Sequence, residues 1–278
     1  MMKISDDCGP IGVFDSGYGG LTILRDIRRE LPQFDYVYLG DNARAPYGTR
    51  SFDVVYRFTL EAVERLFAIG CRLVILACNT ASAKALRTIQ QVDLPRIDPT
   101  RRVLGVIRPT VEELGNLSVN GHIGVCGTPG TVQSRSYEME IAKLYPDFVT
   151  VQQACPMWVP LVENREASSP GADYFVRQEI NRLFDRDPAI DTLLLACTHY
   201  PLLYDKIRLY TPSAVRVVAQ GNIVARSLRD YLDRHRSMRQ RCSTGGSCVY
   251  LTTENVEKFS ELASMFVGDT VNAVNIEL

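Results

Sequence analysis

Two short segments of this 278-residue chain repeat one pattern, in which a run of apolar residues leads into a cysteine. Residues 73–80 read Leu-Val-Ile-Leu-Ala-Cys-Asn-Thr, and residues 193–199 read Leu-Leu-Leu-Ala-Cys-Thr-His. A short apolar run bounded by polar residues is typical of a strand that is buried on both faces of a parallel sheet. We therefore expect Cys78 and Cys197 at the carboxyl ends of parallel strands, where open α/β sheets bind their ligands.

The residues around the two cysteines suggest what such a site binds. Thr80 and Thr198 are placed to cap the helices that follow, and the N-terminal amides of a helix favour an anion. Two thiols in matching positions suggest one contribution from each of two similar halves of the chain. We expect Cys78 and Cys197 to face each other across a small anionic substrate.

A second repeat supports this division into halves. Residues 123–128 echo residues 11–16 at an offset of 112 (123 − 11), and the cysteines repeat at an offset of 119 (197 − 78). Similar offsets indicate an internal duplication. The repeated order of strand, helix and strand predicts an α/β chain with a mainly parallel sheet, flanked by helices, in each of two pseudo-symmetric domains. We assign residues 1–105 and 220–278 to the first domain and 106–219 to the second, with the active site in the cleft between them.

The composition limits the class of protein and its partners. Apolar residues make up 46% and charged residues 23% of the chain, as in an ordinary globular protein. The net charge of −1 gives no electrostatic reason to expect nucleic acid or an anionic membrane as partner. No apolar run approaches the ~20 residues that span a bilayer, and no secretory signal precedes the first predicted strand. We expect a cytoplasmic protein that acts on a small molecule.

The cysteine spacing argues against a metal centre or a disulfide framework. None of the eight cysteines forms a C-x-x-C pair, and the chain has three histidines. We interpret Cys71, Cys126 and Cys155 as small buried hydrophobic residues. Cys8, Cys242 and Cys248 fall in predicted tail or loop segments, where only proximity would favour a disulfide.

Further candidate residues lie in polar segments beside predicted strands. Asp15 and Ser16 precede a glycine-rich turn that lacks dinucleotide or P-loop spacing, so the turn is either purely structural or a substrate loop. The position of Asp15 at a strand end favours the second interpretation. A Pro-Tyr-Gly turn at residues 46–48 is another candidate binding loop. Glu163 is equally consistent with a surface acid and with an acid/base group.

Several segments are predicted from prolines and charge. Because prolines interrupt helices, we expect residues 154–163 to form an apolar loop. Residues 93–102 and 236–247 are expected to be surface loops. A helix over residues 255–266 and a strand over 271–276 are expected to return to the first half.

The paired cysteines narrow the choice of reaction. Nucleophilic catalysis uses one cysteine with a histidine, and redox pairs usually lie close in sequence. Moving a proton from one face of a carbon to the other requires two acid/base groups, one on each face. A thiol has a reference pKa near ~8.5, which nearby cations lower, so a thiol and a thiolate can coexist at neutral pH. His199 and Asp15 are placed to tune the two thiols differently.

These motifs together resemble the aspartate/glutamate racemase family, and within it the cofactor-independent glutamate racemases. The resemblance rests on residues 15–17, 46–48, 78–81 and 197–201 and extends over essentially the whole chain. It implies interconversion of L- and D-glutamate without cofactor or metal, with D-glutamate supplied for peptidoglycan, in a cytoplasmic homodimer. It makes Cys78 and Cys197 the two proton donor/acceptors, with Asp15, Glu163 and His199 as assisting groups. The substrate-binding positions that it implies are Asp15, Ser16, Tyr47, Gly48, Asn79, Thr80, Thr128, Thr131, Thr198 and His199.

The chain departs from the family pattern in two places. Arg108-Pro109-Thr110 stands where Glu-Pro-Gly is common, and Ala219 stands where an aspartate is usual. Both departures lie outside the cysteine motifs. They therefore bear on the interdomain hinge and on an effector site rather than on the reaction.

Four alternatives remain. The first is an aspartate racemase or another relative that acts on a different acid; the aspartate racemases carry glutamate after Cys-Thr in the second cysteine motif, where this chain has His199. A pyridoxal phosphate racemase needs a lysine in a glycine-rich phosphate setting, and none of the five lysines has one: Lys3, Lys84, Lys143, Lys206 and Lys258. A non-catalytic binding module has no need of both cysteines together with Asp15 and His199. Two cysteines that serve only as core residues would leave their paired occurrence unexplained.

Overall fold

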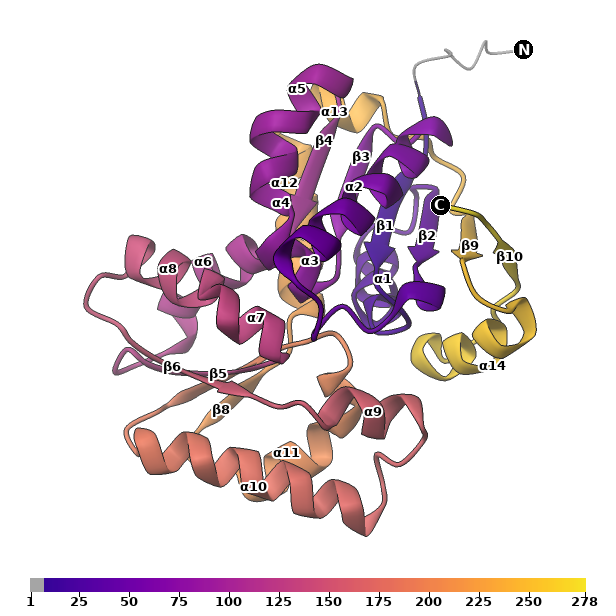
Figure 1. Ribbon diagram of the computed structural model, residues 1–278. Helices are drawn as coiled ribbons and strands as arrows, with labels where there is room; N and C mark the ends of the chain where they lie inside the picture. The colour runs from indigo at the N-terminus through magenta and orange to yellow at the C-terminus, as the bar shows by residue number, and fades with distance from the viewer. Residues whose placement is uncertain (1–7) are drawn as a thin grey trace.

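The computed structural model describes residues 8–278 and contains two parallel sheets with helices on their faces (Figure 1). Residues 1–7, which belong to the first predicted domain and include Lys3, lie outside the described residues. The first sheet has the strand order β10-β9-β2-β1-β3-β4. Its strands are β1 (Ile11–Asp15), β2 (Tyr36–Gly40), β3 (Leu73–Leu76), β4 (Arg102–Gly105), β9 (Cys248–Thr252) and β10 (Ala273–Asn275).

The second sheet repeats the central part of the first. Its order is β6-β5-β7-β8, which matches β2-β1-β3-β4 strand for strand. Its strands are β5 (His122–Gly127), β6 (Val149–Ala154), β7 (Thr192–Ala196) and β8 (Arg216–Val218). The predicted α/β class with two similar parallel sheets is therefore confirmed, and we call the parts around the first and second sheets the first and second lobes.

Helices connect the parallel strands, as such crossovers require. In the first lobe these are α1 (Gly20–Glu30), α2 (Phe52–Ala68), α3 (Asn79–Lys84), α4 (Leu86–Thr88) and α5 (Leu94–Ile97). Those between β4 and β8 are α6 (Ile107–Leu117), α7 (Pro129–Ser134), α8 (Ser136–Leu144), α9 (Trp158–Glu163), α10 (Pro170–Arg186) and α11 (Tyr204–Tyr210). The chain ends with α12 (Gly221–Arg234), α13 (Arg236–Gln240) and α14 (Val256–Val267), and has short turns of other helix types at Asn42–Arg44, Ile89–Asp93 and Tyr200–Leu203.

The strands that lead to the two cysteines, β3 and β7, are buried along their whole length. Every residue of β1, β3 and β7 is buried, because helices cover both faces of each sheet. Each fully buried Leu, Ile or Val side chain contributes about 1.5–3 kcal/mol to folding. This burial explains why the apolar runs before the cysteines lack the alternation of a half-exposed strand.

The chain returns to the first lobe at its C-terminal end, as predicted. β9 pairs in parallel with β2, and β10 extends the sheet beyond β9. In Figure 1 these strands and α14 are yellow and lie beside the indigo β1 and β2. α12 packs against α1, so segments about 200 residues apart in sequence share one core.

Three predicted loops contain short helices instead. α5 lies within residues 93–102, α9 within 154–163 and α13 within 236–247. Pro160 occupies the third position of α9, where a backbone N–H has no acceptor in the same helix, so a proline there removes no hydrogen bond. Pro95 lies in α5, which continues directly from the helical turns of Leu86–Thr88 and Ile89–Asp93. α13 is held by Met238, which is buried in the main hydrophobic cluster.

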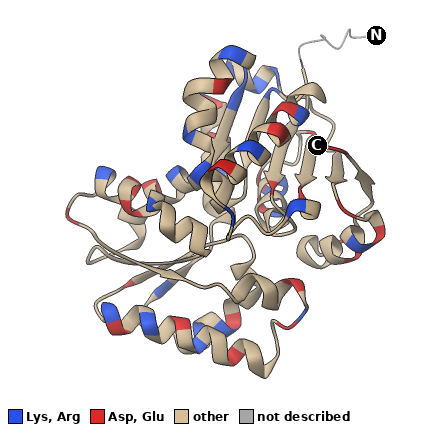
Figure 2. Ribbon diagram, in the orientation of Figure 1, with Lys and Arg blue, Asp and Glu red and all other residues tan. Residues whose placement is uncertain are grey.

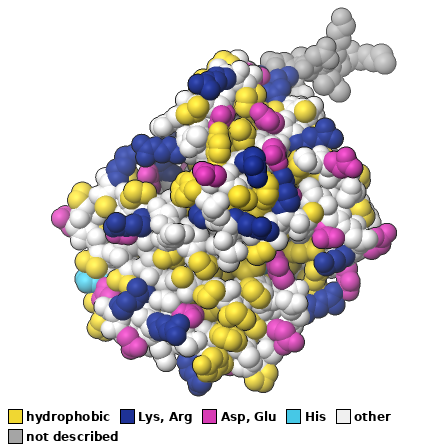
Figure 3. All heavy atoms as spheres, viewed as in Figure 1, with side chains coloured by type: hydrophobic (Ala, Val, Ile, Leu, Met, Phe, Trp, Pro, Cys, Tyr) yellow, Lys and Arg dark blue, Asp and Glu magenta, His cyan; other side chains and the backbone are white. Residues whose placement is uncertain are grey.

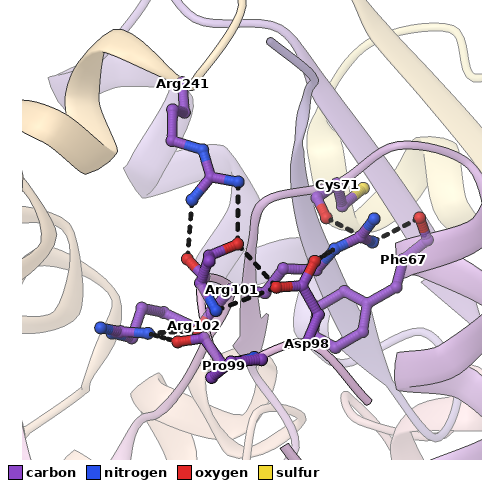
Figure 4. Close-up of polar contacts among 8 residues, drawn as sticks. Phe67, Cys71, Asp98, Pro99, Arg101, Arg102 and Arg241 are labelled. Carbon is purple, nitrogen blue, oxygen red and sulfur yellow. Dashed lines mark hydrogen bonds and ion pairs between the residues drawn. The ribbon is translucent and has the colours of Figure 1, made fainter. Parts of the chain in front are cut away.

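The loop before β4 is also more ordered than its charges suggested. Arg101 donates through one guanidinium nitrogen to the backbone oxygens of Phe67, at 2.5 Å, and Cys71, at 3.2 Å (Figure 4). Arg241 donates to the backbone oxygen of Thr100 at 2.8 Å and to its hydroxyl oxygen at 3.1 Å. These hydrogen bonds therefore hold the loop against the C-terminal end of α2 and against the segment after α13.

Charges of both signs are spread over the helices of both lobes (Figure 2). On the face drawn in Figure 3, Lys and Arg side chains alternate with Asp, Glu and hydrophobic side chains. Among the described residues, no helix has both the length and the apolar character required to cross a bilayer.

Candidate active site

A cavity of about 140 Å³ lies where the two lobes meet, and both lobes contribute residues to its wall. Its residues follow the carboxyl ends of β1, β2 and β3 in the first sheet and of β5, β6 and β7 in the second. The predicted site residues found in its wall are Ser16, Tyr47, Gly48, Cys78, Asn79, Thr80, Thr128, Glu163, Cys197, Thr198 and His199. Asp15 and Thr131 stand behind this wall.

Cys78 directly precedes α3, and its sulfur makes two contacts. Its sulfur accepts a hydrogen bond from the Ala81 amide at 3.4 Å and lies 3.5 Å from the Ser16 hydroxyl. Cys78 is thus the N-cap itself, so the prediction that Thr80 caps this helix is wrong. Burial, reinforced by the charge of Asp15, raises the pKa of the Cys78 thiol to about 12 against the opposing hydrogen bonds. Cys78 therefore keeps its proton at neutral pH.

Cys197 lies in a different electrostatic setting. Its buried sulfur lies 3.9 Å from the Nδ1 atom of His199. A tight turn at Tyr200–Leu203 follows it instead of an α-helix, so Thr198 does not act as the predicted cap. The Thr198 hydroxyl instead donates to the Asp15 carboxylate at 3.4 Å.

His199 connects Cys197 to Glu163. Its Nε2 atom lies 2.9 Å from the Glu163 carboxylate. Burial opposes the imidazolium, but the hydrogen bonds to Cys197 and Glu163, and their charges, raise the pKa of His199 to about 10. The resulting cation stabilises negative charge on the Cys197 sulfur. Glu163 thus lines the cavity and pairs with His199.

Asp15 is placed behind the cavity wall, between the two cysteine motifs. It is 1% exposed and accepts a hydrogen bond from the Gly17 amide at 2.9 Å. Burial raises the pKa of Asp15, and the nearby His199 opposes this shift. A Cβ at Gly20 would lie 2.4 Å from the Asp15 Cβ, so the glycine-rich turn makes room for the buried aspartate. The turn thus has both a structural role and a role at the site.

Hydroxyl groups from both lobes meet at one end of the cavity. The Thr80 hydroxyl lies 3.0 Å from that of Thr128 and 3.3 Å from that of Thr131. Thr128 caps α7 and accepts from the Thr131 amide at 3.2 Å. No lysine or arginine is among the described residues of the cavity wall. Apart from His199, the donors in the described part of the wall are neutral hydroxyl and amide groups, which can bind a carboxylate.

Tyr47 contributes to the cavity differently from a free hydroxyl. Its side chain is 1% exposed, and its hydroxyl donates to Asp41. The Tyr47 phenol is thereby engaged within the first lobe. Its neighbour Gly48 accepts a hydrogen bond from the Gly130 amide at 2.7 Å, which joins this loop to α7 in the second lobe.

The sequence analysis missed one wall of the cavity, formed by Cys155, Pro156, Val159 and Pro160. These residues come after β6 and from α9, the segment predicted to be an apolar loop. Cys155 is buried, as expected, but it also faces the site. Its place after the carboxyl end of a parallel strand was the available signal.

The described residues include no group of three or more His, Cys, Asp or Glu side chains that could hold a metal ion. The cavity thus brings together two thiols in unlike electrostatic settings, the His199 imidazole, and hydroxyl and amide donors. Thiols can take up and release protons, and such donors can bind a carboxylate.

Comparison with known proteins places this geometry in a family. The model of the Asp/Glu/Hydantoin racemase family matches residues 11–228. A glutamate racemase from Roseobacter denitrificans is 41% identical over 267 residues, which cover 92% of this chain and 96% of the relative. A glutamate racemase from Persephonella marina is 38% identical over 269 residues, which cover 96% of this chain and 97% of that protein.

Solved structures agree in fold over nearly the full length. A glutamate racemase isoform from Bacillus anthracis has a TM-score of 0.88 at 34% identity, over 97% of this chain and 98% of that one. The enzyme from Francisella tularensis in complex with D-glutamate has a TM-score of 0.87 at 29% identity, over 98% of each chain. These matches confirm the resemblance drawn from the motifs. The chain belongs to the Asp/Glu/hydantoin racemase family.

Proposed function

We propose that this chain interconverts L- and D-glutamate by transferring protons on the two faces of Cα, with Cys78 and Cys197 as the two bases. The observation that carries the proposal is that two thiols from opposite lobes line one cavity, beside a paired His199 and Glu163. The curated relatives and the solved structures that match over almost the whole chain are glutamate racemases, which supports glutamate as the substrate.

The electrostatic difference between the thiols suggests how one turnover begins. The His199 imidazolium stabilises a thiolate at Cys197, while Cys78 keeps its proton. The Cys197 thiolate removes the Cα proton from the enantiomer whose hydrogen faces it. The Cys78 thiol then delivers its own proton to the opposite face, which inverts the configuration. The other enantiomer reacts by the reverse steps, after the two sulfurs have exchanged protonation states through solvent.

The surrounding groups stabilise the charge that develops on the substrate. Loss of the Cα proton leaves a carbanion, whose negative charge is shared between Cα and the adjacent carboxylate. The Ser16 hydroxyl and the Asn79 amide line the cavity and can stabilise this charge by hydrogen bonds. The threonines at the interlobe contact supply donors for a second carboxylate.

The resemblance also implies a wider role, which we include in the proposal. The enzyme would supply D-glutamate for peptidoglycan, act in the cytoplasm and form a homodimer. We also propose domain boundaries at 105/106 and 219/220. The first falls at the end of β4, and the second falls just before α12.

Among the alternatives, the cavity argues most strongly against cysteines that are only core residues. Both are buried, yet both also line the same hollow. For a pyridoxal phosphate enzyme, Lys84 is the lysine nearest the cysteine motifs, but it donates to the Arg50 carbonyl at 2.7 Å and is not in the cavity wall. Aspartate stays the nearest rival substrate, because its carboxylates make the same kinds of contact.

Circular dichroism of the purified protein with D-glutamate, and separately with D-aspartate, tests the proposal. We expect the optical signal of D-glutamate to decay to that of the racemate, and the D-aspartate signal to persist. Decay of the D-aspartate signal alone would transfer the proposal to aspartate. No decay with either amino acid would contradict the racemase activity itself.

A further inference from the structure

The chain passes between the lobes twice, and four buried polar side chains connect these two passages to the wall of the cavity. Thr110 comes from α6, Tyr137 from α8, Gln220 from the N-terminus of α12, and Asn79 from α3. Each is at most 3% exposed. Of the four, Asn79 alone lines the cavity, next to Cys78. We call these four residues the hinge network.

One backbone carbonyl, that of Val106, determines which group is donor and which is acceptor in each hydrogen bond of the hinge network. The Thr110 hydroxyl donates to the Val106 carbonyl at 2.7 Å, so its oxygen can only accept from Gln220 Nε2, at 2.9 Å. The same Nε2 atom donates to the Tyr137 hydroxyl at 2.7 Å. Tyr137 in turn donates to Asn79 Oδ1 at 2.5 Å, and Gln220 Oε1 accepts from Asn79 Nδ2 at 2.7 Å.

This direction determines how the Asn79 amide is presented. An amide can rotate by half a turn and exchange its oxygen and nitrogen at little steric cost. Here a half-turn would set the Asn79 nitrogen against the donating Tyr137 hydroxyl and its oxygen against Gln220 Oε1. The amide carries two N–H protons, and the bond to Gln220 uses one of them. The second is left for a ligand in the cavity.

We propose that Thr110, Tyr137 and Gln220 are positioning residues, which orient the Asn79 amide as a hydrogen-bond donor to a substrate carboxylate. This inference rests on the function proposed above and assigns these three residues a part in it. None of the three is in the cavity wall, so each acts through Asn79.

The hinge network also couples the orientation of Asn79 to the arrangement of the lobes. Thr110 lies in the first turns of α6, where the chain enters the second lobe, and Gln220 lies where it returns. Of the departures from the family pattern, Thr110 bonds to the network, whereas Arg108 is half-exposed and pairs with two glutamates. A rotation of the lobes that separates Thr110 from Gln220 releases the Asn79 amide.

The sharpest test removes one hydroxyl far from the substrate. Thr110→Val keeps the shape of the side chain but removes the acceptor of Gln220. Thr59→Val is the matched control, because Thr59 is fully buried in α2 and its hydroxyl also donates to the carbonyl four residues earlier at 2.7 Å. Both variants lose one buried hydrogen bond to a backbone carbonyl, and Thr110→Val also loses the bond from Gln220. A purely structural role would therefore lower the melting temperature of both, that of Thr110→Val more, and leave KM unchanged in both.

We expect Thr110→Val to raise KM for D-glutamate about threefold to tenfold, the range that corresponds to loss of one hydrogen bond. Thr59→Val should keep the wild-type KM, and Thr110→Ser, which retains the hydroxyl, should restore it. Calorimetric titration with D-glutamate should show the same order of affinities without turnover. Equal KM values for Thr110→Val and Thr59→Val would overturn the inference.

A second variant tests the direction of the hydrogen bonds. Gln220→Glu replaces the donating Nε2 atom by an oxygen, so neither the Thr110 nor the Tyr137 hydroxyl receives its proton. Because residues of one network are energetically coupled, Thr110→Val should raise KM little further in this background. Independent, multiplying effects would contradict a shared network. If the wild type neither binds nor racemises glutamate, the proposed function fails and this inference fails with it, whereas an active wild type with an unaffected Thr110→Val rejects the inference alone.

Discussion

The His199 imidazole and the Glu163 carboxylate form a hydrogen-bonded ion pair, with 2.9 Å between Nε2 and Oε1. They come from different elements of the second lobe: Glu163 ends α9, and His199 follows β7. The other imidazole nitrogen, Nδ1, faces Cys197. The Glu163 carboxylate therefore acts on the sulfur indirectly, by stabilising the imidazolium beside it. In the described part of the first lobe no such cation acts on Cys78, which instead has the carboxyl group of Asp15 nearby. The two thiols thus have opposite electrostatic neighbours.

The first prediction concerns stability and pH. Because the pKa of His199 is raised from 6.5 to about 10 in the folded protein, its stabilisation is complete below about pH 6.5 and disappears as the pH rises to about 10. Glu163→Gln removes a partner of the cation and should lower the free energy of unfolding by about 1.5–3 kcal/mol at pH 6.5.

The deficit of Glu163→Gln relative to the wild type should shrink steadily as the pH approaches 10. Urea denaturation of both proteins at pH 6.5, 8 and 9.5 measures it. Using the difference between the proteins cancels the titration of groups that they share. A deficit that stays constant over this range would mean that His199 is neutral in the folded wild type.

The second prediction concerns the two thiols as proton carriers. Cys78→Ser and Cys197→Ser should each lower kcat for racemisation by at least about 10²–10⁴-fold, because a serine hydroxyl is a far weaker acid/base group at neutral pH. Cys126→Ser is a suitable control, since Cys126 is fully buried in β5 and is not in the cavity wall. Full activity in either cavity variant would rule out the two-thiol scheme.

The third prediction concerns the origin of the proton in the product. In D₂O, the L-glutamate formed from D-glutamate should carry deuterium at Cα, because the thiol that donates has exchanged its proton with solvent. Mass spectrometry of the separated enantiomers during the initial phase measures the label. Transfer of the substrate's own hydrogen to the product would indicate one base that serves both faces.

The fourth prediction uses the difference between the thiols directly. Since burial raises the pKa of Cys78 to about 12 and a cation lies beside Cys197, a limiting amount of iodoacetamide at pH 7.5 should alkylate Cys197 first. The two sulfurs are similarly buried, at 6% and 5% residue exposure, so access alone does not predict this order. Peptide mass spectrometry identifies the modified residue, and Cys78 reacting first would reverse our assignment of the thiol and the thiolate.

Local patterns in the sequence were sufficient to predict the fold and the strand ends that carry the site. The apolar runs before Cys78 and Cys197 identify strands buried on both faces, and the geometry of parallel sheets places the residues after these strands at one edge. The cap of α7 is also local, because Thr128 accepts from an amide only three positions along the chain. Such features depend on neighbours in the chain and can be read without a structure.

Only the tertiary structure decided which side chains act on one another. The cap at α3 is Cys78 rather than Thr80, and the α9 segment forms a helix and a wall of the cavity in spite of Pro160. The Gln220–Thr110 bond spans 110 positions, and the approach of Asn79 to Gln220 spans 141. Hydrophobic periodicity determines which face of an element is buried, whereas a hydrogen bond depends on ångström-scale placement of two lobes. That placement results from the packing of the whole chain, so no local pattern in the sequence predicts it.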